Sequence, residues 1–260
     1  MAAFVVLAAG VLGLIFGSFA SMLAYRLPRK LPMGGRERSR CPACDAQLTA
    51  RENIPVASYL AQRGRCRHCG ARIPSRYPLI EGATGLLFAL AAWKFGPSGE
   101  AVVFAGFFFT LVVLTVIDLE HLLLPNRIVY PAFIAGWIAL SLLALATSEV
   151  ARLGDAALGA LIFGGFFTLV AFIYPAGMGG GDVKLAFVLG TFLGWLGVPG
   201  VVLVGMFLSF VLGALGGIIT AAATGGGRKT AVPFGPFLAL GAVLAVFLGA
   251  PIAETYSSYL

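Results

Sequence analysis

Long apolar segments, separated by short polar or glycine- and proline-containing breaks, run along most of this chain. Each segment is close to the roughly 20 residues that a bilayer-spanning helix needs, although the sixth is short. The uncharged stretch 185–227 is too long for one span, and we expect Gly197-Val198-Pro199-Gly200 to divide it with a tight turn. The pattern predicts eight helices, over residues 3–24, 79–95, 101–117, 128–147, 156–174, 183–198, 201–223 and 237–253.

Glycines spaced four residues apart occur within three of these predicted helices. Small residues at that spacing let helix backbones approach closely in lipid. We therefore expect a packing role for the pairs Gly13/Gly17, Gly190/Gly194 and Gly213/Gly217.

Composition supports a membrane protein. Hydrophobic residues make up 59% of the 260 residues and charged residues 11%, whereas soluble domains carry about 25% charged residues. This excludes a soluble monomer, a disordered chain and a disulfide-rich secreted scaffold. The first apolar segment follows no basic leader and is too long for a signal-peptide core, so we expect it to be retained. The fold class predicted is an all-α polytopic membrane protein with about eight transmembrane helices.

Charge is concentrated in one insert between the first two predicted helices. Residues 26–78 hold 12 of the 18 Lys and Arg residues but 3 of the 11 Asp and Glu residues, and all four cysteines. We therefore predict a first helix (1–25), a cytoplasmic insert (26–78) and a seven-helix body (79–260). Because Lys and Arg gather on the cytoplasmic side, both chain termini are expected outside. Anionic lipid headgroups are the nearer partner for this charge, and no nucleic acid is expected.

The four cysteines form two C-x2-C pairs with 21 residues between them. Two such pairs supply the four thiolates of a closed structural zinc site. A disulfide pair or free thiols are the alternatives, and disulfides are disfavoured in the cytoplasm. His68 lies inside the second pair, where we expect an exposed side chain and not a ligand. The predicted zinc ligands are Cys41, Cys44, Cys66 and Cys69.

Two of the four aspartates stand at the predicted cytoplasmic ends of apolar helices. Asp118 ends the segment 101–117, and Asp182 follows a glycine-rich stretch in which Gly179 and Gly181 leave room for a substrate backbone. Two carboxylates brought together in a partly dry place share one proton and form an acid–base pair. Each residue by itself is also compatible with an ordinary role, Asp118 at the interface and Asp182 at a helix start.

Other chemistries have less support. The chain lacks G-x-S-x-G, and the glycines at 225–227 lack the Gly-Lys of a phosphate loop. A transporter with proton-relaying aspartates would be expected to place them near the midplane between symmetric halves. Both aspartates lie at span ends instead, and no repeat is evident.

Taken together, these motifs resemble the type IV prepilin peptidases, the bifunctional leader peptidase/N-methyltransferase family. The G-x-G-D motif is shared with other intramembrane aspartyl proteases, but the ordered set is specific and covers nearly the whole chain. In chain order the motifs are Phe16-Gly-Ser-Phe, Tyr25-Arg-Leu-Pro28, the two cysteine pairs, Glu52-Asn-Ile-Pro55, Ser58-Tyr-Leu60, Arg63-Gly-Arg-Cys66, Arg76-Tyr-Pro-Leu-Ile-Glu81, Asp118 with Leu124-Pro125, Gly179-x-Gly181-Asp182-x-Lys184 and Val232-Pro-Phe-Gly-Pro236.

The resemblance implies a membrane aspartyl protease of the bacterial inner membrane, with Asp118 and Asp182 as its catalytic pair. It implies prepilin and pseudopilin substrates of type IV pilus or type II secretion systems, cut after a glycine at the cytoplasmic face. Many members then methylate the new N-terminus with S-adenosylmethionine, and a peptidase without methylation remains an alternative. The implied substrate-binding or supporting residues are Gly179, Gly181, Lys184, Asn126, Pro233, Phe234 and Gly235.

Some of these positions leave a choice. Asn126 stands where many relatives carry aspartate, so any role here is neutral hydrogen bonding. Lys184 either pairs with a carboxylate or contacts headgroups, and the segment from Pro233 either shapes a substrate groove or stiffens the entry to the last helix. Candidates for methyl transfer are Asn53, Arg76 and Glu81. For Glu81, the alternative is an interfacial residue at the start of a helix.

Overall fold

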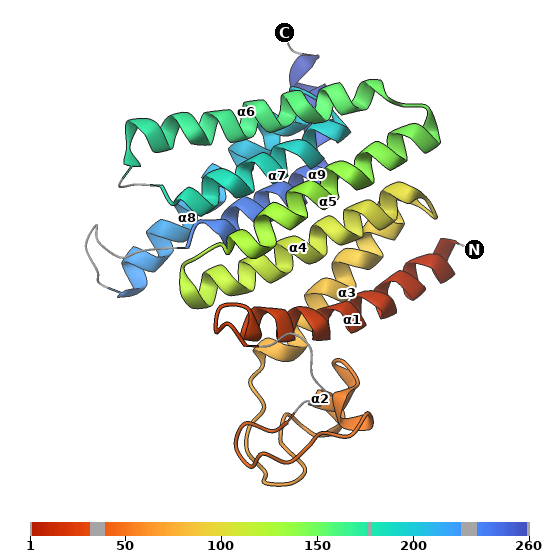
Figure 1. Ribbon diagram of the computed structural model, residues 1–260, viewed down its shortest axis with the longest axis vertical. Helices are drawn as coiled ribbons and strands as arrows, with labels where there is room; N and C mark the ends of the chain where they lie inside the picture. The colour runs from red at the N-terminus through yellow and green to blue at the C-terminus, as the bar shows by residue number, and fades with distance from the viewer. Residues whose placement is uncertain (1, 32–39, 176–177, 225–232, 259–260) are drawn as a thin grey trace. The chain divides into compact units, whose positions relative to one another are not determined.

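The computed structural model describes residues 2–31, 40–175, 178–224 and 233–258. Val232 and the glycines at 225–227, named above, lie outside these residues. The regular elements of the described residues are helices, beside two isolated β-bridges in the loops of the insert, which confirms the all-α class (Figure 1). Its elements are α1 (Ala2–Arg26), η1 (Arg51–Asn53), α2 (Ala57–Ala61), α3 (Arg76–Phe95), α4 (Gly99–His121), α5 (Asn126–Thr147), α6 (Ala151–Ile173), α7 (Gly180–Leu196), α8 (Gly200–Thr224) and α9 (Gly235–Ser257).

Each of the eight predicted apolar segments lies on one helix, but eight membrane spans are not confirmed. Within the described residues, six helices are long and apolar enough to cross a membrane, namely α1, α4, α5, α6, α8 and α9. The other two are α3 and α7, and α7 has only 17 residues. The expected turn is present, because α7 ends at Leu196 and α8 begins at Gly200.

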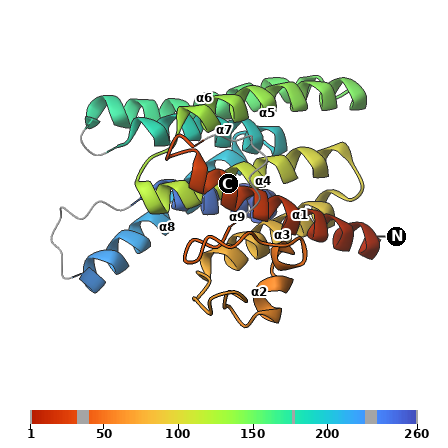
Figure 2. The same ribbon diagram turned by 60° about the horizontal axis from the view of Figure 1, so that its bottom comes forward.

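The chain divides into two compact units, Met1–Val113 and Leu114–Leu260, so that α4 contributes to both. In the first unit α1 and α3 pack side by side (Figure 2). A Cβ at Gly13 would lie 2.7 Å from the Thr84 carbonyl oxygen, and one at Gly17 would lie 2.5 Å from the Glu81 Cα. These two glycines therefore serve the close helix packing that their spacing predicted.

In the second unit, α7 packs against α5, α6, α8 and α9. Its residues from Leu185 to Trp195 are almost all buried, which explains how so short a helix is stable. A Cβ at Gly190 would lie 2.8 Å from the Ala160 Cα on α6, so this pair of helices is in backbone contact. Gly213 meets the Phe234 ring instead, and Gly217 faces open space, so the third glycine pair does not mediate a helix crossing.

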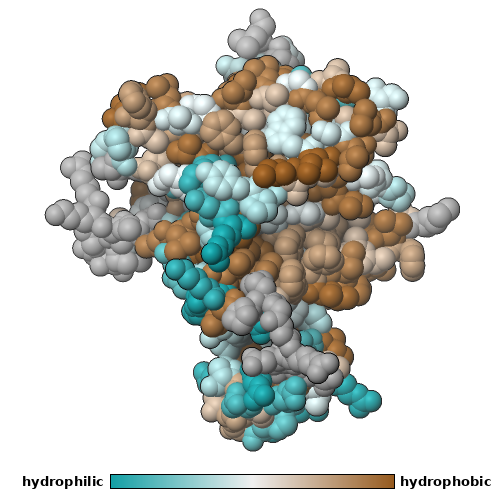
Figure 3. Space-filling view, viewed as in Figure 1, coloured by the Kyte–Doolittle hydropathy of each residue, from teal (hydrophilic) through white to brown (hydrophobic). Residues whose placement is uncertain are grey.

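The end of α7 is held by a side chain from α6. The Arg152 guanidinium donates two hydrogen bonds of 3.2 Å to the Trp195 carbonyl oxygen and lies 4.2 Å from the Trp195 ring centroid. A cation at a helix C-terminus satisfies carbonyl groups that have no partner within the helix. Large apolar side chains are exposed on α1, α5, α6 and α8, and hydrophobic residues cover much of the face drawn in Figure 3, which suits contact with lipid tails.

Candidate active site and metal centre

Asp118 lies in the last turn of α4 and is 5% exposed. Its Oδ2 accepts a 3.0 Å hydrogen bond from the backbone N–H of Gly235, the first residue of α9. A Cβ at Gly235 would lie 2.7 Å from the same oxygen. A Cβ at position 235 would therefore push this carboxylate away from the amide.

Asp182 is the third residue of α7, which begins after Gly179. Its carboxylate turns back and accepts a hydrogen bond from the N–H of Gly179, as a helix-start acid does in a capping box. A Cβ at Gly179 would lie 3.0 Å from Asp182 Oδ2. Because Gly179 and Gly180 are exposed, this side of the carboxylate remains open to approach.

The structure brings the two aspartates together from α4 and α7, close enough for their charges to interact. Leu124 fills the space beside them. Its side chain approaches both Gly181 and Gly235, the glycines at the starts of α7 and α9. The end of α4 and the starts of α7 and α9 therefore lie around the two carboxylates.

Lys184 lies one turn further along α7 than Gly181, and its partners among the described residues are an amide oxygen and an aromatic ring. Its Nζ donates a 2.9 Å hydrogen bond to Asn126 Oδ1 at the start of α5 and lies 5.5 Å from the Tyr130 ring centroid. Asn126 is thus a neutral acceptor for Lys184 in this structure, and any contact with a substrate stays a prediction. Because Asn126 carries no charge, this contact leaves the charge of Lys184 uncompensated.

Pro233 and Phe234 lead into α9 and are partly buried. The Phe234 ring lies 6.1 Å from both Phe167 and Phe210, measured between ring centroids. This aromatic packing holds the segment before Gly235 and so fixes where the Gly235 amide lies.

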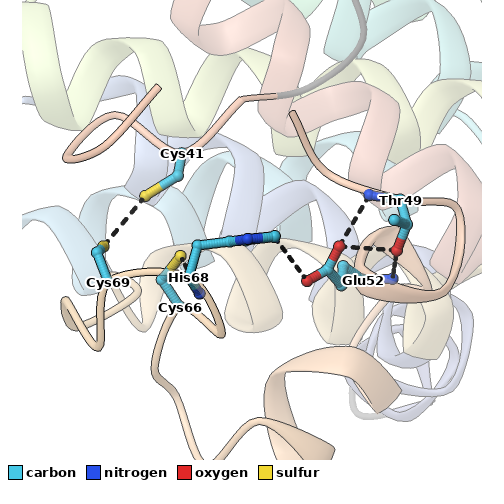
Figure 4. A network of polar contacts seen from close by, with 6 residues as sticks. All are labelled: Cys41, Thr49, Glu52, Cys66, His68 and Cys69. Atoms are coloured by element: carbon cyan, nitrogen blue, oxygen red, sulfur yellow. Dashed lines mark hydrogen bonds and ion pairs between the residues drawn. The ribbon is translucent and has the colours of Figure 1, made fainter. Parts of the chain in front are cut away.

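A second cluster belongs to the insert. The ligand atoms of Cys41, Cys44, Cys66 and Cys69 all lie within 4.8 Å of one another, and the Sγ atoms of Cys41 and Cys69 are 3.9 Å apart (Figure 4). A tetrahedral zinc with bonds of about 2.3 Å has ligands about 3.8 Å apart. The four cysteines therefore fit one tetrahedral metal ion, and none forms a disulfide.

The two cysteine loops are built alike. The N–H of Cys41 donates to the carbonyl of Ala46, and the N–H of Cys66 donates to that of Ala71. The residues after each pair, Asp45 and Gly70, have φ values of 56° and 72°, which turns both loops tightly. The backbone N–H groups of Ala43 and Cys44 lower the pKa of the Cys41 thiol to about 7, whereas burial and the neighbouring thiols raise the pKa of Cys44 to about 12. Without a bound cation, the four clustered thiols therefore do not all ionise together.

His68 is not merely an exposed side chain, as the sequence had suggested. Its Nε2 lies 3.3 Å from Glu52 Oε1, so it joins the second cysteine loop to η1 (Figure 4). Glu52 also accepts hydrogen bonds from the N–H and Oγ1 of Thr49, at 2.9 and 2.7 Å. These bonds hold the pKa of Glu52 below its usual value. Sequence reasoning missed this network, although Thr49-x-x-Glu52 is a capping-box pattern.

Glu81, in the second turn of α3, has hydrogen-bond partners that could not be predicted from the sequence. Its Oε2 accepts a 2.7 Å hydrogen bond from the N–H of Val56, and Ser18 of α1 also bonds to it. Arg76 stacks on the Tyr77 ring at 5.1 Å, and Asn53 is exposed. Glu81 therefore ties the insert to the paired helices α1 and α3.

Six helices long and apolar enough to cross a membrane, with a four-cysteine cluster in the insert, characterise a polytopic membrane protein. Residues 11–95 match the Bacterial Peptidase A24 N-terminal domain, and residues 105–218 match the Type IV leader peptidase family. The chain belongs to the type IV leader peptidase family.

Named relatives are similar along almost their whole length. The chain is 37% identical to the Prepilin leader peptidase/N-methyltransferase of Stutzerimonas stutzeri, over 98% of this chain and 94% of the relative. It is 36% identical to the protein of that name from Bacillus subtilis (strain 168), over 95% of each. No solved structure gave a significant match.

Proposed function

We propose that this chain is a membrane aspartic endopeptidase that removes the basic leader from prepilins and pseudopilins. The observation that carries the proposal is the meeting of Asp118 and Asp182, in a chain whose relatives are named for prepilin cleavage. One carboxylate takes a proton from water while the other gives a proton to the carbonyl of the scissile bond. Water then adds to the carbonyl carbon, and no covalent enzyme intermediate is needed.

We further propose that cleavage follows a glycine at the cytoplasmic face. A basic leader does not easily cross the membrane, and Lys and Arg favour the cytoplasmic side for the insert and for the loops beside both aspartates. The apolar helix of the substrate would lie in lipid beside the enzyme helices. The substrates would come from type IV pilus or type II secretion systems.

The dyad is tested by reconstituting the enzyme with a synthetic peptide that has a basic leader, a glycine and an apolar segment. Asp118→Asn and Asp182→Asn should each abolish cleavage. Asp155→Asn, which changes an exposed aspartate on α6, is the matched control and should cleave normally. Retained cleavage in either dyad variant would disprove the assignment.

We also propose that the enzyme methylates the new N-terminus and that zinc holds the insert. S-adenosylmethionine supplies the methyl group when bound. Its sulfonium and amino groups are positive, and the partly buried carboxylate of Glu81 beside the insert fits that charge. Arg76 and Asn53 are further candidates near the insert. Mass spectrometry of the processed peptide distinguishes this from a peptidase without methylation, because only a methylated product gains the mass of one CH2 group.

A further inference from the structure

In the first turn of α9, the backbone N–H of Gly235 is free to donate to a partner outside the helix. Pro236 has no N–H, and the N–H groups of Phe237 and Leu238 donate to the Phe234 carbonyl. The partner that Gly235 takes is the carboxylate of Asp118, 117 residues earlier in the chain. Asp118 therefore caps α9 from another helix, and the positive end of the α9 dipole faces its charge.

The two carboxylates of the dyad are held differently. The bond from Gly179 to Asp182 is local and lies in an exposed segment, whereas the bond from Gly235 to Asp118 is long-range and buried. A hydrogen bond to a charge is stronger where water is excluded. The negative charge of a dyad that shares one proton is therefore better stabilised on Asp118.

The surrounding charges do not reverse this difference. Lys184, on α7, is directed to Asn126 at the start of α5. On α4, His121 Nε2 lies 3.9 Å from Glu120 Oε2, and Arg127 follows Asn126 on α5. The sequences of α8 and of α9 before Glu254 contain no charged residue. Among the described residues, the backbone amide of Gly235 is thus the group that distinguishes Asp118 from Asp182.

We propose that Gly235 is a positioning residue of the dyad, whose amide keeps Asp118 as the carboxylate while Asp182 carries the shared proton. This inference rests on the proposed peptidase function and assigns the two roles within it. Asp118 takes a proton from the attacking water, and Asp182 gives its proton to the carbonyl oxygen, which leaves a gem-diol. When the C–N bond breaks, the amine leaves with the proton held by Asp118, and a diol hydroxyl returns its proton to Asp182. One water is consumed, and the dyad regains its starting state.

The test is the pH profile of kcat/KM for the synthetic prepilin-like peptide. Gly235→Ala keeps the N–H and a helical backbone, but its Cβ displaces the Asp118 carboxylate from the donor. Losing this bond should raise the pH of the acidic limb by roughly one unit. The value of kcat near neutral pH should fall about tenfold, with KM little changed. Gly165→Ala, on α6, is the matched control because its Cβ faces open space, and it should leave both limbs in place.

The limb of the pH profile that moves in Gly235→Ala shows which aspartate is the base and which is the acid. The acidic limb reports the group that must be ionised for cleavage. A shift of the basic limb alone would show that Asp118 is the acid and would overturn the proposal. If neither limb of the pH profile moves in Gly235→Ala, Gly235 does not position the Asp118 carboxylate. If the wild-type enzyme does not cleave the peptide, the proposed function itself fails, which is a different result.

A measurement on the wild-type chain covers the case in which Gly235→Ala does not fold. Labelling phenylalanine with ¹³C at the carbonyl and glycine with ¹⁵N selects the Phe-Gly peptide bonds, of which the sequence contains four. The Gly235 amide signal should move downfield as the dyad ionises, and Asp118→Asn should remove this titration while Asp182→Asn preserves it. A Gly235 signal that follows Asp182 instead would refute the proposal.

Discussion

Replacing Gly190 by alanine should weaken the contact between α6 and α7 and displace Asp182 with it. The new Cβ would lie 2.8 Å from the Ala160 Cα and still closer to the Gly159 carbonyl oxygen. Ordinary contacts begin at 3.4 Å, so the helices must separate by about 0.6 Å or more. Gly190 lies two turns after Asp182 on the same helix, and a rigid helix transmits that movement to the carboxylate.

Two opposing effects set the size of the change in stability. Overpacking a tight contact costs roughly 1–3 kcal/mol, whereas alanine is favoured over glycine within a helix by about 1 kcal/mol. The net loss in the free energy of unfolding for Gly190→Ala is therefore about 0–2 kcal/mol. Gly165→Ala on α6 gains the helix preference without the clash, so the difference between the two variants isolates the overpacking cost of roughly 1–3 kcal/mol.

The assay has two parts, an unfolding titration with a denaturing detergent and the kcat for peptide cleavage. A misplacement of 1 Å in an active site can cost about a hundredfold in rate, so we expect roughly a tenfold fall in kcat for Gly190→Ala. Gly165→Ala should retain the wild-type rate. If both variants unfold and cleave alike, backbone contact at Gly190 does not hold α7 in place.

Three further predictions concern other contacts. Cys66→Ser should remove the zinc found by elemental analysis and open the insert to trypsin while cleavage persists, and a full zinc content would contradict the four-cysteine site. Arg152→Ala should destabilise the protein by about 2 kcal/mol through loss of the hydrogen bonds to Trp195, with Arg152→Lys intermediate, and a wild-type unfolding curve would count against the cap. Asn126→Asp should form an ion pair with Lys184 that adds about 0.5 kcal/mol at low salt and nothing at high salt. Salt-independent stability in that variant would show that the pair does not form.

The helices could be predicted from the sequence because each is a local property of the chain. An apolar run without charges has to satisfy its backbone hydrogen bonds internally in lipid, and a helix does so within the run itself. For the same reason the break at residues 197–200 was predictable, since glycine and proline act on neighbouring dihedral angles. Which of these helices are long enough to cross a membrane is a finer question, and the prediction of eight spans was not confirmed for α3 and α7.

The cysteine site was predictable because its signal is the spacing of one residue type. Its surroundings were not, since the contact of His68 with Glu52 joins residues from different loops. The same limit applies to Glu81, whose partners Val56 and Ser18 are distant in sequence. Local sequence patterns indicate which side chains are candidates for binding or catalysis. They do not predict which of these side chains lie in contact in the folded protein.

By itself, the sequence determined the membrane class and the helices, and it predicted the four-cysteine cluster and the two candidate catalytic aspartates. The tertiary structure alone decided that a backbone amide from α9 reaches Asp118, that Lys184 is directed to Asn126, and that two glycines on α7 rest on the backbone of α6. Composition and residue spacing can be read directly from the sequence. A contact between residues more than a hundred positions apart depends on how whole helices pack. Backbone donors such as the Gly235 amide are chemically the same at every position other than proline, so only their placement in space distinguishes one from another.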